Sequence, residues 1–98
     1  MTIQEIMECV EQERDYQKKK AAEKGWDKNK RQSEYLLILE SELNEAKYAF
    51  CKGGEGRDSL AHELIQIIAV ATEALELTPS ENKYRLLMLS GREFSIPK

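Results

Sequence analysis

The chain has 98 residues, of which 41% are apolar and 34% charged, with a net charge of −3, five glycines and two prolines. This balance predicts one helical domain with a single modest core, and it excludes a loop-rich or disordered chain. The acidic net charge gives no general reason to bind nucleic acid or an anionic membrane. Cys9 and Cys51 are too few for a disulfide framework and too far apart for a CxxC site, so we expect reduced thiols.

The N-terminus has no apolar signal region. The longest apolar stretch, residues 64–77, is interrupted by polar side chains and is not expected to span a membrane. We therefore expect a soluble, cytoplasmic protein.

The first expected helix extends from the N-terminus to Gly25. Thr2 and Glu5 have the spacing of a capping box at its start, and Gly25 is a natural stop. Beyond Val10 the apolar stripe of this helix fades into polar residues such as Glu13. This apolar stripe consists of Ile3, Ile6, Met7 and Val10, which lie three, four and seven residues after Ile3, as one face of a helix requires.

Residues 26–32 are expected to form a linker before a second helix over about residues 33–51. The glycines at positions 53, 54 and 56 end that helix, and Asp58 is the expected cap of a third helix that runs to about Leu77. The third helix is apolar around most of its circumference, which is typical of the centre of a bundle or of an oligomer interface. The predicted core stripe of the second helix is Leu36, Leu39, Leu43, Ala46 and Phe50.

The fourth expected helix begins at Thr78 as N-cap, with Pro79 at the first helical position and Glu81 at the third. Gly91 closes it, and the tail over residues 92–98 is expected to be flexible. No strand pattern or internal repeat is evident in the sequence. The sequence therefore predicts an all-α four-helix bundle that forms a single domain over residues 1–98.

Two acidic motifs stand on the second and third helices. They are Glu42-x-x-Glu45 and Glu63-x-x-Gln66, with 17 residues between them. Side chains three apart project from the same face of a helix. Glu42 and Glu63 fall within the apolar arcs of their helices, where a carboxylate is costly to bury unless it meets a cation or a hydrogen-bonding partner. Two such helices packed together would aim three carboxylates and an amide at one place.

This arrangement suits a hard metal ion. Carboxylates with no nearby cysteine or second histidine favour Mg²⁺ or Mn²⁺ over zinc. The alternative is chance, because ExxE spacings are common in acidic helices and Glu45 lies only at the edge of its apolar arc.

Basic and aromatic residues near such a site are candidates for holding a substrate. Trp26 is a candidate to stack on a planar ligand, although a lone tryptophan at a helix junction also serves as a lid over the core. His62 lacks a zinc-ligand neighbour and is expected at the surface. The side chains that could hold phosphates, each of which could equally be a solvated charge, are Lys28, Lys30, Arg31, Arg57, Lys83 and Arg85.

The two acidic motifs resemble those of the MazG-like, all-α nucleoside triphosphate pyrophosphohydrolase superfamily, whose pattern is ExxE on one helix and ExxD on the next. Residues 38–46, ILESELNEA, are similar to the first motif, and residues 62–71, HELIQIIAVA, resemble a version of the second found in small phage and bacterial members. Asn82-Lys83-Tyr84 weakly resembles an Asn…Lys-Phe segment of the same fold. The resemblance covers about residues 26–85.

The resemblance implies a Mg²⁺-dependent attack of water between the α- and β-phosphates of a nucleotide, which yields a nucleoside monophosphate and pyrophosphate. Glu42, Glu45 and Glu63 would be catalytic metal ligands, and Lys30, Arg57, Asn82, Lys83 and Trp26 are the candidates for substrate binding. The family also implies a homodimer or homotetramer assembled through the central helices.

Gln66 departs from the family pattern, because it occupies the position of an aspartate. An amide can ligate a metal through its carbonyl oxygen, but it brings no charge and cannot act as a base. Three alternatives therefore stay open: a nucleotide pyrophosphohydrolase, a non-catalytic relative that binds a nucleotide or a protein, and a structural helical adaptor.

Overall fold

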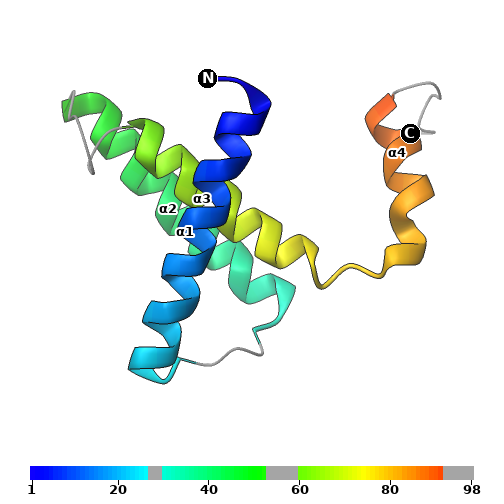
Figure 1. Ribbon diagram of the computed structural model, residues 1–98, viewed down its shortest axis with the longest axis horizontal. Helices are drawn as coiled ribbons and strands as arrows, with labels where there is room; N and C mark the ends of the chain where they lie inside the picture. Colours follow the sequence, from blue (N-terminus) through cyan, green and yellow to red (C-terminus); the bar gives the residue numbers. More distant parts are fainter. Residues whose placement is uncertain (27–29, 53–59, 92–98) are drawn as a thin grey trace.

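The computed structural model describes residues 1–26, 30–52 and 60–91, and these residues form helices and the turns that join them (Figure 1). None of the helices in these ranges is long and apolar enough to cross a bilayer. The elements in chain order are α1 (Ile3–Lys24), α2 (Gln32–Lys52), α3 (Leu60–Leu75), the 3₁₀ turn η2 (Ser80–Asn82) and α4 (Lys83–Gly91).

Helix α1 begins and ends as its sequence predicts. The Thr2 hydroxyl accepts a hydrogen bond from the Glu5 amide (3.1 Å), and the Glu5 carboxylate accepts one from the Thr2 amide (2.7 Å). At the other end Gly25 adopts a left-handed conformation with φ of 67°, which a residue with a Cβ rarely adopts. Its amide donates back to the last carbonyls of the helix.

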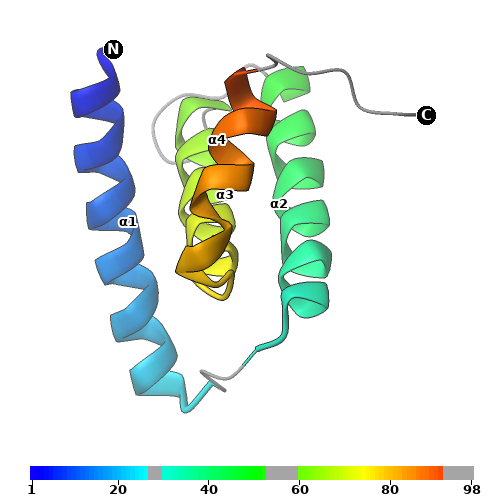
Figure 2. The same ribbon diagram turned by 90° about the vertical axis from the view of Figure 1, so that its right-hand side faces the viewer.

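Helix α3 lies in the centre of the molecule (Figures 1 and 2). It packs against α2, which runs antiparallel to it, and against α1, which crosses the pair. The sequence predicted either the centre of a bundle or an oligomer interface for this apolar helix, and the structure places it at the centre of a bundle. Three of the six buried core residues are alanines, whose small side chains let the helix axes approach closely. The buried core consists of Val10, Tyr35, Ala46, Ala49, Ala69 and Val70.

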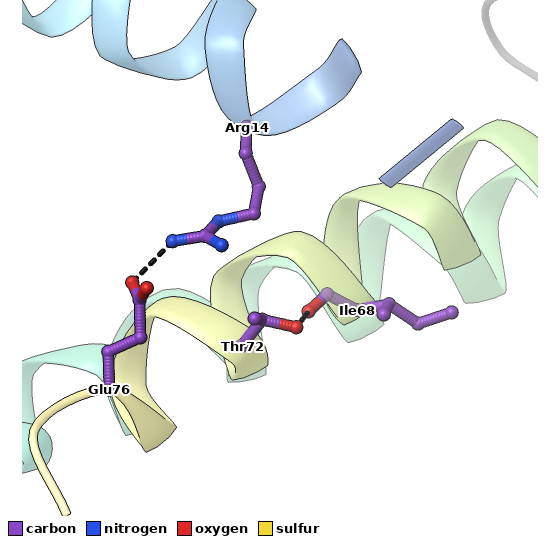
Figure 3. A network of polar contacts seen from close by, with 4 residues as sticks. All are labelled: Arg14, Ile68, Thr72 and Glu76. Atoms are coloured by element: carbon purple, nitrogen blue, oxygen red, sulfur yellow. Dashed lines mark hydrogen bonds and ion pairs between the residues drawn. The ribbon is translucent and has the colours of Figure 1, made fainter. Parts of the chain in front are cut away.

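Polar contacts fix the helices to one another at the C-terminal end of α3. Arg14 of α1 forms an ion pair with Glu76, just beyond α3 (Figure 3). The side-chain amide of Gln32, at the start of α2, donates to the Ala74 carbonyl and to the Thr78 hydroxyl, both at 3.2 Å. Within α3, the Thr72 hydroxyl donates to the Ile68 carbonyl (2.7 Å), which satisfies a half-buried polar group (Figure 3).

The predicted start of the fourth helix is wrong. Pro79, not Thr78, precedes the first turn, and no side chain caps it. The Thr78 hydroxyl accepts a hydrogen bond from Gln32 instead, so a tertiary contact from α2 to the turn after α3 has replaced the local cap. The turn that follows is 3₁₀ and continues into α4 at Lys83.

Two of the predicted apolar stripes are also partly wrong. Ile3 and Met7 on α1 are exposed, because the face of α1 that meets α3 continues from Ile6 and Val10 through Glu13. On α2 the buried residues are Tyr35, Ala46 and Ala49. Three members of the predicted core stripe are exposed: Leu36, Leu43 and Phe50.

Helix α4 stands apart from the other three (Figure 1). Within the described residues its contacts are mainly with η2, and its apolar side chains are exposed. The radius of gyration is 15.7 Å, against roughly 13 Å for a compact domain of this length. Within the described residues the prediction of an all-α fold with four helices is therefore confirmed, although α1, α2 and α3 form the packed core and α4 does not join it. The predictions on Asp58, the glycines at 53–56 and the tail at 92–98 lie outside the described residues.

Candidate metal centre

Three carboxylates converge between α2 and the first turn of α3. Glu42 and Glu45 come from α2 and Glu63 from α3, and one oxygen of each lies within 4.8 Å of the other two. The antiparallel course of the two helices sets the second half of α2 beside the start of α3, and the three-residue spacing keeps Glu42 and Glu45 on one face. Glu42 and Glu63 are half-buried and Glu45 is exposed. The structure thus brings these three predicted residues together.

The pKa of Glu42 is raised above the usual range for a glutamate. The largest cause is burial of its carboxyl, and the negative charges of Glu45, Glu63 and Glu13 add to it, while His62 acts in the opposite direction. Both main causes penalise the charged form, since removal from water and like charges nearby each favour a proton on the oxygen. A cation among these oxygens would reverse that penalty.

Gln66 lies between the carboxylates, as its place in the second motif predicts. Hydrogen bonding assigns the orientation of its amide: the nitrogen donates to Glu63 Oε2 at 2.7 Å and to Glu42 Oε2 at 3.1 Å. The amide group therefore links α3 to α2, and its two N–H groups partly stabilise the charged form of both carboxylates. To ligate a metal through its oxygen, as the sequence predicts, Gln66 has to turn its amide over and give up both hydrogen bonds.

Glu13 is a further residue of this site that sequence reasoning missed. Its carboxylate comes from α1, is 11% exposed, and accepts a hydrogen bond from the Gln17 amide at 3.0 Å. His62 of α3 faces it, with 3.8 Å between the histidine Nε2 and the Glu13 oxygen. The signal was in the sequence, because Glu13 follows Ile6 and Val10 at spacings of seven and three, on the face that α1 turns to α3.

His62 is half-buried, so the expectation that it lies at the surface is wrong. It also lines a groove of about 630 Å³ between the first half of α1 and the start of α3. Glu13 and the apolar side chains of Ile6 and Ile65 line the same groove. The groove and the three carboxylates share the start of α3, where His62 and Leu64, on either side of Glu63 in the sequence, line the groove.

Those predicted substrate-binding residues that the structure describes do not gather at this site. The Lys30 ammonium lies 6.0 Å from the ring centre of Tyr35, near the start of α2 and about 15 Å along the helix from Glu42. Trp26 follows the end of α1, where Lys24 lies over its ring. Asn82 and Lys83 are exposed at the start of the α4 arm, beyond the far end of α3. Arg57 and Lys28 lie outside the described residues.

The donor set fits a hard divalent cation. Magnesium binds through carboxylate oxygens, so three carboxylates with one oxygen of each within 4.8 Å of the other two could hold one ion. A set made only of carboxylates favours Mg²⁺ or Mn²⁺ over zinc. Glu42, Glu45 and Glu63 are the residues that would hold it.

Comparison of the chain with protein-family models, with curated proteins and with solved structures finds no match.

Proposed function

We propose that this protein is a Mg²⁺-dependent nucleotide pyrophosphohydrolase, which converts a nucleoside triphosphate to a nucleoside monophosphate and pyrophosphate. The observation that carries the proposal is the convergence of Glu42, Glu45 and Glu63 from two helices onto one point, at a cost that shows in the raised pKa of Glu42. Gathering carboxylates in this way opposes folding unless a cation or a hydrogen-bond donor offsets it, and a site for a metal and a polyphosphate uses this arrangement.

In this proposal Glu42, Glu45 and Glu63 hold the metal ion, which would neutralise phosphate charge and lower the pKa of the attacking water. Glu63 and Glu42 are fixed by the Gln66 amide, so their oxygens are oriented before the ion arrives. The mainly apolar groove beside them suits a nucleobase, because Ile6 and Ile65 offer apolar surface and Gln12 offers hydrogen-bonding groups.

The same proposal includes a homodimer or homotetramer in the cytoplasm. The exposed apolar side chains of α2 and α4 favour association, since a monomer would leave them in water. Asn82 and Lys83 lie at the start of α4, before these apolar side chains. The way in which an assembly covers α4 would therefore determine whether Asn82 and Lys83 reach a bound nucleotide.

The experiment is to incubate the purified protein with a panel of ribo- and deoxyribonucleoside triphosphates and Mg²⁺ and to measure pyrophosphate. We expect release from at least one nucleotide, loss of release when Mg²⁺ is chelated, and at least a hundredfold loss in Glu63→Gln, on the order of 3 kcal/mol of transition-state stabilisation. Glu40→Gln, at an exposed glutamate on the opposite side of α2 from Glu42, is the matched control and should keep its activity. If the folded protein releases no pyrophosphate from any nucleotide, the proposed pyrophosphohydrolase activity is rejected.

A second candidate is a non-catalytic protein that binds a nucleotide or a protein partner, and the position of Gln66 favours it. The amide supplies two donors to Glu42 and Glu63, which partly stabilises the cluster without a metal. If the natural protein shows a nucleotide-dependent thermal shift without hydrolysis, and Gln66→Asp creates turnover, the protein is a binder. If neither metal nor nucleotide alters its stability, it is a structural helical adaptor.

A further inference from the structure

The basic residues of the chain are unevenly distributed. Eight of the 15 lysines and arginines lie in residues 14–31, together with three of the 18 acidic residues, so this segment carries a charge of +5 and the remainder −8. The net charge of −3 gave no general reason to expect a nucleic-acid partner, but it averages over this separation. A local positive charge on an acidic protein attracts an anionic partner to one place on its surface.

Helix α1 carries most of these basic residues on its second half. The C-terminal end of α1 extends past the nearby ends of α2 and α3 in both views (Figures 1 and 2). Arg14 and Arg31, the two arginines of the segment, already pair with glutamates of the chain. The charge available to a partner therefore comes from the lysines, of which Lys18, Lys19 and Lys24 are exposed.

Two exposed aromatic rings accompany these lysines. Tyr16 is 53% exposed, and the Lys20 ammonium lies 5.9 Å from its ring centre. Trp26 is 48% exposed, and the Lys24 ammonium lies 5.1 Å from its ring centre. Because Tyr16, Lys20 and Lys24 are spaced four residues apart, they follow one face of α1 over about 12 Å. We call Tyr16, Lys20, Lys24 and Trp26 the aromatic–lysine row.

The end of α1 fixes Trp26 beside the other three residues of the row. Gly25 adopts its left-handed conformation directly after the helix, and the Trp26 amide donates to the Ala21 carbonyl at 2.9 Å. The backbone of Trp26 is therefore held by the helix it follows, while its ring stays exposed. Each ring of the row thus has a flat surface in contact with water and a cation within about 6 Å.

The composition of the row distinguishes among anionic partners. A bilayer would require apolar side chains that enter it, but residues 15–26 contain no Leu, Ile, Val, Met or Phe. An acidic peptide would pair with the lysines and leave both rings unused. Double-stranded DNA keeps its bases within the stack, where an exposed ring does not reach them. A single strand offers unstacked bases to the rings and phosphates to the lysines.

From this pairing of rings and cations, we propose that the aromatic–lysine row binds single-stranded nucleic acid, with bases stacked on Trp26 and Tyr16 and phosphates beside Lys20 and Lys24. Every base has a face that stacks on an aromatic ring, so binding has little sequence preference. The proposal does not rest on the pyrophosphohydrolase activity. The row follows Arg14, which pairs with a glutamate just beyond the opposite end of α3 from the candidate metal centre.

The fluorescence of Trp26 tests the proposal, because it is the one tryptophan of the chain. Titration of the purified full chain with an oligothymidylate of about 12 nucleotides should quench its emission, since a stacked base contacts the ring. The logarithm of the association constant should fall with that of the salt concentration with a slope of about −1.4, as expected for two neutralised phosphates of a single strand. A natural protein that does not bind the oligonucleotide overturns the proposal.

Variants measured by the anisotropy of a labelled oligothymidylate separate the row from charge alone. Trp26→Ala should weaken binding about five- to a hundredfold, the effect of one lost stacked base, whereas Trp26→Phe keeps a planar ring and should retain most of the affinity. Lys20→Gln with Lys24→Gln should weaken binding by about fivefold or more and flatten the salt dependence. Lys18→Gln with Lys47→Gln is the matched control, because it removes the same charge outside the row and should weaken binding by less than about twofold.

The position of Lys18 makes this control strict. Lys18 is exposed on the same helix but lies about 160° around it from Tyr16. Equal losses in the row and control variants, with helicity retained in both, would show a non-specific charge effect and overturn the proposal. Equal affinity for a duplex of the same length, for polyglutamate or for phosphatidylserine vesicles would also overturn it. Glu63→Gln should leave oligonucleotide binding unchanged, so this proposal and the pyrophosphohydrolase can fail separately.

Discussion

The carboxylates at the two ends of the α2–α3 pair have opposite surroundings. At one end, which we call the paired end, Glu73 accepts a hydrogen bond from the Tyr35 hydroxyl, and Glu76 pairs with Arg14. At the other, the acidic end, Glu42, Glu45 and Glu63 lie together, and burial, followed by the charges of its neighbours, raises the pKa of Glu42. Both ends use glutamates that face another helix, yet they differ in the donors near them: the Tyr35 hydroxyl and the Arg14 guanidinium at the paired end, and the neutral Gln66 amide shared by Glu42 and Glu63 at the acidic end.

This difference separates residues that stabilise the fold from residues that the fold brings together at a cost in stability. The paired end joins α1, α2 and α3 through Arg14, Tyr35 and Gln32, so its polar groups contribute to stability. The acidic end concentrates like charges in a half-buried place, which opposes folding in the absence of a cation. Local groups that lower the stability of the fold are typical of functional sites. Changes at the two ends are therefore expected to have opposite signs.

The largest effect is expected from Tyr35→Ala at the paired end. Tyr35 is 3% exposed, and truncation leaves a cavity between α2 and α3 and removes the partner of Glu73. A loss of about 3–5 kcal/mol in the free energy of unfolding is expected from urea denaturation. Tyr48→Ala, on the same helix at a side chain 63% exposed, is the control and should change stability by at most about 0.5 kcal/mol. Similar losses in both variants would contradict the packing described here.

The next effect distinguishes the ends by their response to Mg²⁺. Saturating the acidic end at about 100 times the dissociation constant should stabilise the protein by about 2.7 kcal/mol, measured as a rise in Tm. Glu63→Gln removes one ligand and should abolish most of that rise. Glu76→Gln, at the paired end, should lose a little stability and keep the full response to the ion. A response that both variants retain would place the ion elsewhere.

The sequence predicted the acidic end well and the paired end poorly. Glu42 and Glu63 could be found because a carboxylate inside an apolar arc conflicts with the periodicity around it. Glu13 gave the same signal and was missed, since two polar residues further along made the stripe of α1 seem to end at Val10. Tertiary contacts such as Arg14 with Glu76 join residues 62 positions apart, and no local pattern encodes them.

The boundaries of α1 were predictable because its caps are local. The capping box and Gly25 involve residues within three or four positions of one another, and both are present. The start of α4 was not predictable, since Gln32 engages the Thr78 hydroxyl from α2 and leaves the turn without its cap. Leu36, Leu43 and Phe50 show the related limit: apolar periodicity predicts that a face is buried, but not whether the same chain or a second copy buries it.

A smaller effect at the paired end is expected from Tyr35→Phe, which keeps the ring and removes the hydroxyl. Loss of the hydrogen bond to a charged Glu73 should cost about 1.5–3 kcal/mol of unfolding free energy. Burial, then the bond and charge of Glu73, raise the pKa of Tyr35 to about 12. The neutral hydroxyl thus adds stability below the unfolded pKa of about 10 that is lost as pH rises through 12.

Absorbance at 295 nm checks this titration directly. One of the four tyrosines of the natural protein should ionise near pH 12, and that step should be missing in Tyr35→Phe. Four tyrosines that titrate together in the folded natural protein would show that the hydroxyl is in contact with water rather than bound to Glu73.

The smallest effect, and the one of opposite sign, is expected from Glu42→Gln at the acidic end. A neutral amide of the same shape removes the charge that burial, Glu45 and Glu63 all oppose. Without metal the variant should be more stable at pH 7 by about 0.5–1 kcal/mol, a rise in Tm of roughly 2–8 °C, and its response to Mg²⁺ should be lost.

The pH dependence of that gain follows from the direction of the Glu42 shift. The folded protein binds a proton at Glu42 more readily than the unfolded chain, so the carboxyl favours folding fully below the unfolded pKa of about 4.5. This contribution is lost as pH rises through the folded pKa, and the advantage of Glu42→Gln should grow over the same range. Urea denaturation of both proteins from pH 4 to pH 7 without metal measures it. A variant less stable than the natural protein at pH 7 would mean that donors such as the Gln66 amide stabilise the Glu42 carboxylate by more than burial and the neighbouring charges oppose it, which contradicts the prediction.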